Sequence, residues 1–372
     1  MTRDIVFVYD HFYPDYSAGG PVTSLANLAA LLGNSCSIKI LTSAWRYSPR
    51  KKLDNIPFNE WTTTNGLPVW YADSSWSISN AIETLKEGST CYLNGMFSKD
   101  FFLPVLRKCK RQGLSVVVTP RGMLQEGALR NKALKKRIYL FGLHISGTLN
   151  GVRWHATDEA ERNDIRRHFG KKLPVDVIPN VPRLPLPVNS AIAKEPGVLK
   201  LVYFSLISRK KNLGFLLDLL ASPGFEGITL DVVGPVKDND YWSECRPLIE
   251  RSGGRVRYLG DRNPAEVNEL LSHYHLFVLP TQGENFGHAI VEAMSSWRPV
   301  MISEFTPWKD VQPLHGGFSL PLVPSVWETK LNEVQSWSQE DFDTACSGAM
   351  DYFRNKINMS ALQSLYLALF DR

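Results

Sequence analysis

The chain has few cysteines for its 372 residues, and they are widely spaced. The five are Cys36, Cys91, Cys109, Cys245 and Cys346, and no two of them form a Cys-x-x-C pair. An odd, scattered set is typical of reduced thiols and disfavours both a disulfide framework and a zinc site. We therefore expect a protein of a reducing compartment, the cytoplasm, without a structural metal.

Long apolar runs are also missing. A membrane-spanning helix needs about 20 consecutive apolar residues, and no segment comes near that length. The first apolar run, residues 5–9, is too short for a signal peptide and is typical of a first β-strand. The fingerprint Gly-x-Gly-x-x-Gly is absent as well, so no dinucleotide cofactor is expected. These absences predict a soluble protein that works without a cofactor.

The chain has ample apolar material, 44% of its residues, for two buried cores, and its length favours about two domains. The net charge of +5 conceals an asymmetry, because residues 1–185 carry +10 and the remainder carries −5. A basic first half and an acidic second half suggest two domains with different partners.

Residues 1–185 alternate short apolar runs with helical patterns, which is typical of a parallel sheet with crossover helices. The runs predict strands at 5–9, 37–42, 115–119, 153–157 and 175–179. Helices are predicted at 21–32, 99–112 and 130–143. Five prolines then fall between residues 179 and 196, and such a density favours a stiff connector because proline supports neither helix nor central strand. We place a linker at 186–197.

The α/β pattern restarts in a second domain, residues 198–345. Strands are predicted at 199–205, 228–234, 256–259, 276–280 and 299–303, and helices at 213–220, 287–297 and 339–370. A helical tail, residues 346–372, is expected to pack back on the first domain. Two doubly wound domains predict a ligand in the cleft between them, near the carboxyl ends of the strands.

The clearest chemical signal is E-N-F-G-H-A-I-V-E-A, residues 284–293, which follows a predicted strand and opens a predicted helix. A helix N-terminus presents unpaired N–H groups and partial positive charge, which suit a diphosphate. Gly287 permits close approach of the backbone to a ligand, and Glu292 lies where a carboxylate can accept both hydroxyls of a ribose. Alternatively, Glu284 complements the helix dipole and Glu292 is a solvated helix residue.

This stretch resembles family 4 of the nucleotide-sugar glycosyltransferases, which have the GT-B fold of two Rossmann-like domains facing each other across a cleft. The family hallmark is two glutamates separated by seven residues, with Phe-Gly between them and Ala after the second. The resemblance implies that Glu284 binds the donor sugar and Glu292 the ribose, while the backbone of Phe286, Gly287, His288 and Ala289 contacts sugar and phosphate. Residues 283–308 look especially like members that build bacterial surface polysaccharides, lipopolysaccharide among them.

A second resembling element, residues 204–213, follows the first strand of the second half. The family has an arginine early and a lysine late in this loop, and Lys211 fits the lysine. Leu206 stands where the arginine is usual, and Arg209 lies close enough to replace it. Two cations stabilise the charge that develops on a leaving diphosphate without a metal. We recognise no Asp-x-Asp motif that would hold a catalytic metal, so we expect metal-independent transfer. A solvated turn is the alternative interpretation.

In the first half, Gly19 and Gly20 follow the first strand and would let a phosphate or sugar approach the backbone. Arg121, after residues 115–119, is a candidate contact of donor sugar and phosphate, equally consistent with an ordinary loop arginine. His155 is a weaker candidate for the acceptor, and Asp158 could simply begin a helix. The resemblance matches Asp310 to a family acidic residue near the base or ribose.

The predicted helix 130–143 is basic and partly apolar, with Ile138, Leu140 and Phe141 among its cations. Peripheral attachment to the cytoplasmic face of an anionic inner membrane and a solvated surface helix fit this pattern equally well. No recognised nucleic-acid-binding module accompanies the cations, which disfavours a nucleic-acid partner.

The resemblance, together with these features, implies a retaining hexosyltransferase that uses a UDP- or GDP-sugar and a glycan or polyprenyl-linked acceptor. Catalytic roles fall to Glu284, Lys211, Arg209 and Arg121. Two alternatives stay open: a nucleotide-sugar epimerase of the same fold, and a non-catalytic scaffold.

Overall fold

The computed structural model describes residues 3–15, 20–47, 50–130, 133–183, 192–262 and 266–371. The chain forms two compact units, the first being Met1–Val181 with Met359–Arg372 and the second Pro182–Asn358. Residues 186–191 of the expected linker lie outside the described residues. Residues 192–197 belong to the second unit, where Lys194 Nζ donates to Gln335 O at 2.9 Å and Trp337 O at 3.1 Å. This stretch is therefore folded onto the second unit and is not a free connector.

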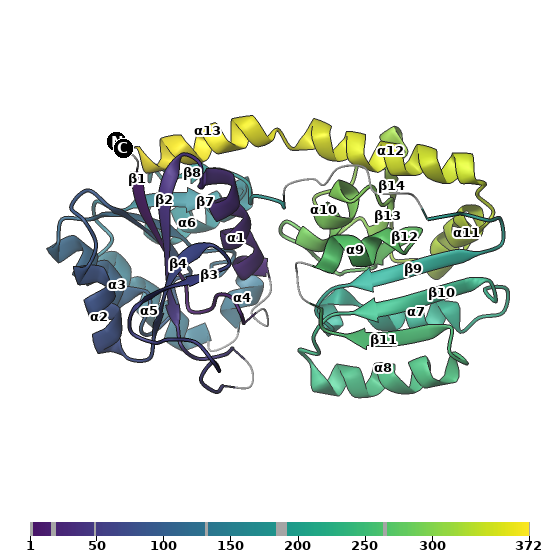
Figure 1. Cartoon of the computed structure of the whole chain (residues 1–372), viewed down its shortest axis with the longest axis horizontal. Coiled ribbons are helices and arrows are strands. Elements are labelled where there is room, and N and C mark those ends of the chain that lie inside the picture. The colour runs from purple at the N-terminus through teal and green to yellow at the C-terminus, as the bar shows by residue number, and fades with distance from the viewer. Residues whose placement is uncertain are drawn as a thin grey trace. The chain divides into compact units, whose positions relative to one another are not determined.

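The first unit is built on an eight-stranded sheet with the order β3-β4-β2-β1-β5-β6-β7-β8. Figure 1 labels β1 to β4, β7 and β8 of this sheet. Every pair is parallel except the hairpin of β3 and β4. The strands are β1 (Arg3–Val8), β2 (Cys36–Ser43), β3 (Trp61–Thr64), β4 (Leu67–Ala72), β5 (Thr90–Asn94), β6 (Ser115–Thr119), β7 (Arg153–Ala156) and β8 (Asp176–Val177).

Helices cover both faces of this sheet, because alternate residues of its central strands are apolar in both directions. In β1, Ile5 and Phe7 join a core formed with α1 and α13, whereas Val6 and Val8 join a core formed with α2, α3, α5 and α6. The helices are α1 (Gly20–Leu32), α2 (Ser75–Glu83), α3 (Leu103–Arg111), α4 (Glu126–Arg130), α5 (Ala133–Ile145), α6 (Glu159–Phe169) and α13 (Met359–Phe370). Residues 131–132 of the expected helix 130–143 lie outside the described residues.

The second unit has a six-stranded, wholly parallel sheet in the order β11-β10-β9-β12-β13-β14 (Figure 1). Its strands are β9 (Leu199–Phe204), β10 (Ile228–Val233), β11 (Val256–Gly260), β12 (Leu276–Leu279), β13 (Val300–Ser303) and β14 (Gly317–Leu320). Its helices are α7 (Leu213–Leu220), α8 (Asn239–Arg251), α9 (Val267–Ser272), α10 (His288–Ser295), α11 (Pro324–Gln335) and α12 (Gln339–Lys356), with short 3₁₀ turns η1 (Arg209–Lys211) and η3 (Gln312–Leu314).

The C-terminal region is not the single helix expected at 339–370. It divides at Ile357, whose extended backbone (φ −125°, ψ 96°) ends α12. α12 buries Met350 and Phe353 in the core of the second unit, whereas α13 buries Tyr366 and Phe370 in the core of the first. The expected tail of 346–372 is thus shared between the units. Among the residues described, none of the helices combines the length and apolar content that a membrane span requires.

Candidate active site

The loops that follow β9 and β12 meet at one edge of the second sheet. β9 pairs with β10 on one side and β12 on the other, so the strand order reverses between β9 and β12. In open α/β sheets ligands bind at such a reversal, beyond the carboxyl ends of the strands, because the two following helices leave in opposite directions. The two sequence elements that resemble family 4 are these two loops.

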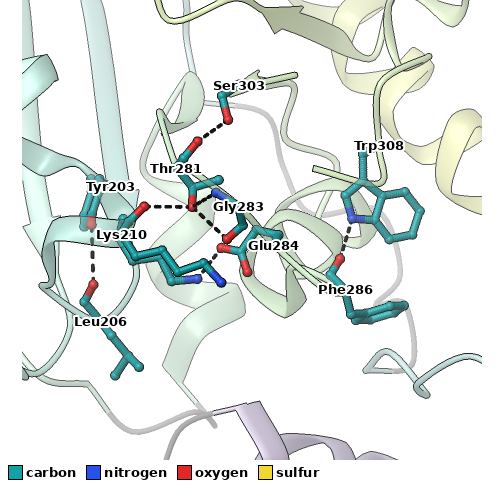
Figure 2. Close-up of polar contacts among 10 residues, drawn as sticks. Tyr203, Leu206, Lys210, Thr281, Gly283, Glu284, Phe286, Ser303 and Trp308 are labelled. Atoms are coloured by element: carbon teal, nitrogen blue, oxygen red, sulfur yellow. Dashed lines mark hydrogen bonds and ion pairs between the residues drawn. The ribbon is translucent and has the colours of Figure 1, made fainter. Parts of the chain in front are cut away.

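The loop after β12 is held in one conformation by hydrogen bonds to both neighbouring loops (Figure 2). Thr281 Oγ1 donates to Lys210 O at 3.1 Å and accepts from Gly283 N at 3.2 Å. Ser303 Oγ donates to the carbonyl of Thr281, and Glu284 N donates to Phe305 O at 3.0 Å. The position of Glu284 is thereby fixed before any ligand binds.

Glu284 and Lys211 form an ion pair across this edge of the sheet. They are 73 residues apart in the chain, and their side chains are only 10% and 18% exposed. A half-buried pair of this kind is held in place by both loops, and its charges are screened less than those of a surface pair. The structure therefore places a carboxylate and a cation side by side beyond the carboxyl ends of β9 and β12.

Gly287 begins α10 in the left-handed backbone region, with φ 75°. A Cβ atom at this position would lie 2.9 Å from Ile290 Cδ1, the end of a side chain that can shift, so it is mainly the left-handed backbone that favours glycine here. The preceding carbonyl, Phe286 O, accepts a hydrogen bond of 2.6 Å from Trp308 Nε1 (Figure 2). The backbone N–H groups of His288 and Ala289 lie in the first turn of α10, directly after Gly287. First-turn N–H groups have no partner within the helix, and a helical anion site uses these groups.

Glu292 is buried in α10 and is 5% exposed. Burial raises the pKa of its carboxyl to about 7, against the opposing effect of Arg183. Among the described residues, none donates a hydrogen bond to this carboxylate. The interpretation of Glu292 as a solvated helix residue is therefore wrong, and a buried carboxyl without donors is typical of a ligand-binding group.

The side chain of Arg209 is directed away from the position of the family arginine that it was expected to replace. Its guanidinium forms an ion pair with Glu244, with Nη1 2.9 Å from Oε2, and lies 5.4 Å from the centre of the Tyr241 ring. Both charged side chains are more than half exposed. Arg209 is thus directed toward α8, and this geometry does not support its expected role as a replacement for the family arginine.

Other cations surround Leu206 instead. A cleft of about 690 Å³ is lined by Leu206, Ser208, Lys210, Lys211, Lys237 and residues 238–240. Lys210 lies along the loop of Glu284, because its Cε is 3.3 Å from the point where a Cβ of Gly283 would stand. The sequence interpretation gave no role to Lys210 or Lys237. The available signal for Lys237 was its position after β10, the strand next to β9.

Two Asp-x-Asp triplets, a pattern that can hold a metal, lie in the second unit at residues 238–240 and 341–343. Both cap helices. Asp238 Oδ1 accepts from Tyr241 N at 3.0 Å at the start of α8, and Asp341 Oδ2 accepts from Ser338 N at 2.9 Å at the start of α12. Across the described ranges no group of three or more His, Cys, Asp and Glu side chains is arranged to hold a metal ion.

Arg121 lies within the first unit, with a left-handed backbone of φ 55°. Its guanidinium donates to Asn94 Oδ1 at 3.0 Å, to Tyr92 Oη at 3.0 Å and to Asn180 Oδ1. Three of its five N–H groups are therefore used inside the unit, where they join the ends of β5 and β8. This arrangement favours a positioning role over the expected contact with the donor.

The remaining candidate residues have mainly structural contacts. The ring of His155 is fully buried, with Tyr92 Oη at 2.7 Å and Ile178 O at 2.8 Å from its nitrogens. Burial lowers the pKa of His155 to about 3, so it is a neutral core residue and not an acceptor contact. Asp158 caps α6 through Glu161 N at 2.7 Å. Asp310 binds Tyr352 and Lys356 of α12. Gly20 is the exposed first residue of α1, and Gly19 lies outside the described residues.

A known protein family matches part of the second unit. Residues 199–327 match the family model described as Glycosyl transferases group 1, a range that contains Lys211, Glu284 and Glu292. Over that range the chain is similar to this family. The match confirms the predicted enzyme class, a glycosyltransferase.

Solved glycosyltransferase structures resemble the whole chain. HepE of Anabaena, in complex with UDP and glucose, is 16% identical, with 100% of each chain covered and a TM-score of 0.69. Sucrose-phosphate synthase from Thermosynechococcus elongatus is 15% identical over 99% of each chain, with a TM-score of 0.68. WaaG, a glycosyltransferase involved in lipopolysaccharide biosynthesis, is 14% identical over 99% of each chain, with a TM-score of 0.61. No curated protein sequence matches the chain at a significant level. The predicted GT-B fold is confirmed.

Proposed function

We propose that this glycosyltransferase moves a hexosyl group from a nucleotide-diphosphate sugar to a glycan or polyprenyl-linked acceptor, with retention of configuration and without a metal. The observation that carries the proposal is the loop and helix of residues 281–292. This segment places the Glu284–Lys211 pair at the reversal of strand order and the buried carboxyl of Glu292 eight residues further on.

Each group has a distinct part in donor binding. The carboxylate of Glu292 accepts hydrogen bonds from two ribose hydroxyls, which supply the donors that the protein does not. The N-terminus of α10 receives the diphosphate, and Glu284 accepts from hydroxyls of the donor sugar. Since Glu284 is already held by Lys211 and by Phe305 O, it loses little freedom when the sugar binds.

Lys211, assisted by Lys210, provides the positive charge for the reaction. The bond between the anomeric carbon and the diphosphate oxygen breaks, and negative charge grows on the leaving group. The acceptor oxygen bonds to the anomeric carbon on the same face, and its proton passes to a diphosphate oxygen. A fixed cation in a poorly hydrated site stabilises this developing charge, so no protein general base is needed.

Arg209 and Arg121 have supporting parts in this proposal. Arg209 is bound to Glu244 and holds the loop against α8. Arg121 orders the strand ends of the first unit, to which we assign the acceptor, together with Gly19 and Gly20. Lys210 and Lys237 border the same cleft as Lys211. They supply the second positive charge beside the diphosphate, the charge that the sequence interpretation assigned to Arg209.

A uridine donor is the first to test, because the HepE structures contain UDP and UDP-glucose. WaaG acts in lipopolysaccharide biosynthesis, which supports a role in bacterial surface polysaccharides. We propose that the acceptor for such a polysaccharide is carried on a polyprenyl lipid, and that the enzyme works at the cytoplasmic face of the inner membrane as a peripheral protein.

The test is calorimetric titration of the full chain with UDP- and GDP-sugars, followed by product analysis with and without acceptor. Binding of one donor class by the wild type and at least about tenfold weaker binding by Glu292→Gln are expected. Release of an epimerised sugar nucleotide without acceptor would identify an epimerase. The absence of binding to every donor in both classes would identify a scaffold.

A further inference from the structure

α5 of the first unit carries a stripe of uncovered apolar side chains. Leu134, Ile138, Phe141 and Ile145 are 73%, 64%, 65% and 65% exposed. Their spacings of four, three and four residues bring them onto one face of the helix. We call these four residues the α5 stripe.

The opposite face of α5 is anchored in the protein. Leu140 and Leu143 are 3% and 4% exposed and belong to the core of the first unit, so the helix cannot rotate to hide its stripe. The three apolar residues named from the sequence therefore lie on two sides of the helix, Leu140 on the buried side and Ile138 and Phe141 on the outward side.

Exposure of this kind is concentrated on α5. The described residues include eleven large apolar side chains that are exposed, and four of them form the α5 stripe. Scattered exposed apolar residues are ordinary, whereas a contiguous set usually marks an interaction surface.

The charges around the α5 stripe have one sign. Residues 133–145 contain no aspartate or glutamate. Lys135 and Arg137 are exposed on either side of Lys136, which is itself bound to Ala128 O at 2.6 Å and lies over the Phe97 ring. An apolar face bordered by cations and free of acidic residues complements a surface with anionic headgroups above an apolar interior.

We propose that the α5 stripe docks the protein on a lipid bilayer that contains anionic lipids. α5 lies parallel to the surface, the stripe enters the boundary between headgroups and acyl chains, and Lys135 and Arg137 contact anionic headgroups. The purpose of the docking, access to a polyprenyl-linked acceptor, rests on the proposed function, but the docking itself does not require catalysis.

Co-sedimentation of the full chain with vesicles tests this directly. One set contains phosphatidylcholine alone and the other contains phosphatidylglycerol in addition. The wild type is expected to bind the anionic vesicles, and a triple variant, Leu134→Ser, Ile138→Ser and Phe141→Ser, at least about tenfold more weakly, because each lost side chain buries apolar area in the bilayer. Trp76→Ser is the matched control, since Trp76 is 70% exposed on α2, and it should bind like the wild type.

A charge variant separates the two contributions. Lys135→Ala with Arg137→Ala should weaken binding about fivefold per cation at low salt, and the loss should shrink as salt is raised. Equal sedimentation of the wild type and the triple variant would overturn the proposal. So would self-association without lipid that the triple variant abolishes, because a second copy of the chain would then cover the stripe.

Donor titration of the same variants keeps this proposal separate from the proposed function. Vesicle binding without any donor binding would refute the donor site and leave the docking surface standing. Donor binding by the triple variant that equals the wild type shows that its second unit is folded. A near-UV circular dichroism spectrum and a thermal unfolding curve that match the wild type show that the first unit, which carries α5, is folded too, so the loss of vesicle binding then reports on the stripe.

Discussion

Glu292→Gln should make the protein without ligand more stable and at the same time weaken donor binding. Burial raises the pKa of the Glu292 carboxyl from 4.5 to about 7. A raised carboxyl pKa means that the folded protein holds a proton more tightly than the unfolded chain. The stability that this proton contributes is complete below about pH 4.5 and is lost as pH rises to about 7.

The magnitude follows from the same shift. At 1.36 kcal/mol per pKa unit, ionised Glu292 lowers the free energy of unfolding by about 3 kcal/mol above pH 7. A neutral glutamine of similar shape avoids this cost, so at pH 8 the second unit should unfold roughly 6–12 °C higher. At pH 4.5 the two proteins should differ little. Thermal unfolding at both pH values, monitored by circular dichroism, measures the difference.

Donor affinity should change in the opposite direction. Hydrogen bonds to a charged acceptor contribute about 1.5–3 kcal/mol, which corresponds to a Kd higher by roughly 10- to 150-fold in Glu292→Gln. Wild-type affinity should rise as pH increases through about 7, whereas the affinity of the variant should stay flat. Glu328→Gln, at a half-exposed position of α11 away from the site, should match the wild type in every assay. A variant that is destabilised at pH 8, or that binds donor normally, would refute this reasoning.

Three further predictions, two of them with a comparison variant, concern other residues. Lys211→Ala should lower kcat by about 10²–10³-fold through the loss of transition-state charge stabilisation. The kcat of Arg209→Ala should stay within about threefold of the wild type. A comparable loss of kcat in both variants would show that Arg209 acts in the reaction. Gly287→Ala should cost at least about 1–2 kcal/mol in urea unfolding because of its φ of 75° and the nearby Ile290 Cδ1, and Gly260→Ala, with φ 77° and open space, should cost less. Arg121→Met should lower stability by about 2–4 kcal/mol and leave donor Kd within about threefold; weaker donor binding at unchanged stability would instead indicate a direct contact.

Local pattern was sufficient for many single elements. The strand predicted at 115–119 and the helix predicted at 213–220 have those bounds in the structure, as β6 and α7. Weakly patterned elements were missed, among them the hairpin of β3 and β4 and the proline-containing helix α8. The pattern at 339–370 continues through a break because its apolar residues face two different cores, and periodicity does not reveal which core a side chain enters.

The same division holds within the site. The order of glycine, glutamates and phenylalanine in residues 283–292 is a property of one loop and one helix, so the sequence predicted it. Arg209 and Lys210 are neighbours in the chain and equivalent by composition. The tertiary structure separates them, because Glu244 of α8 is in reach of Arg209 while Lys210 lies along Gly283.

The sequence by itself determined the α/β pattern, the two-unit organisation and the two loops that carry the chemistry, because these depend on residue order over short distances. Only the tertiary structure decided that Lys211 meets Glu284, since that pairing requires β9 and β12 to be neighbours in the sheet. It also decided the chemical state of Glu292 and the exposure of the α5 stripe. Burial depends on every element packed around a side chain, and no local pattern contains that information.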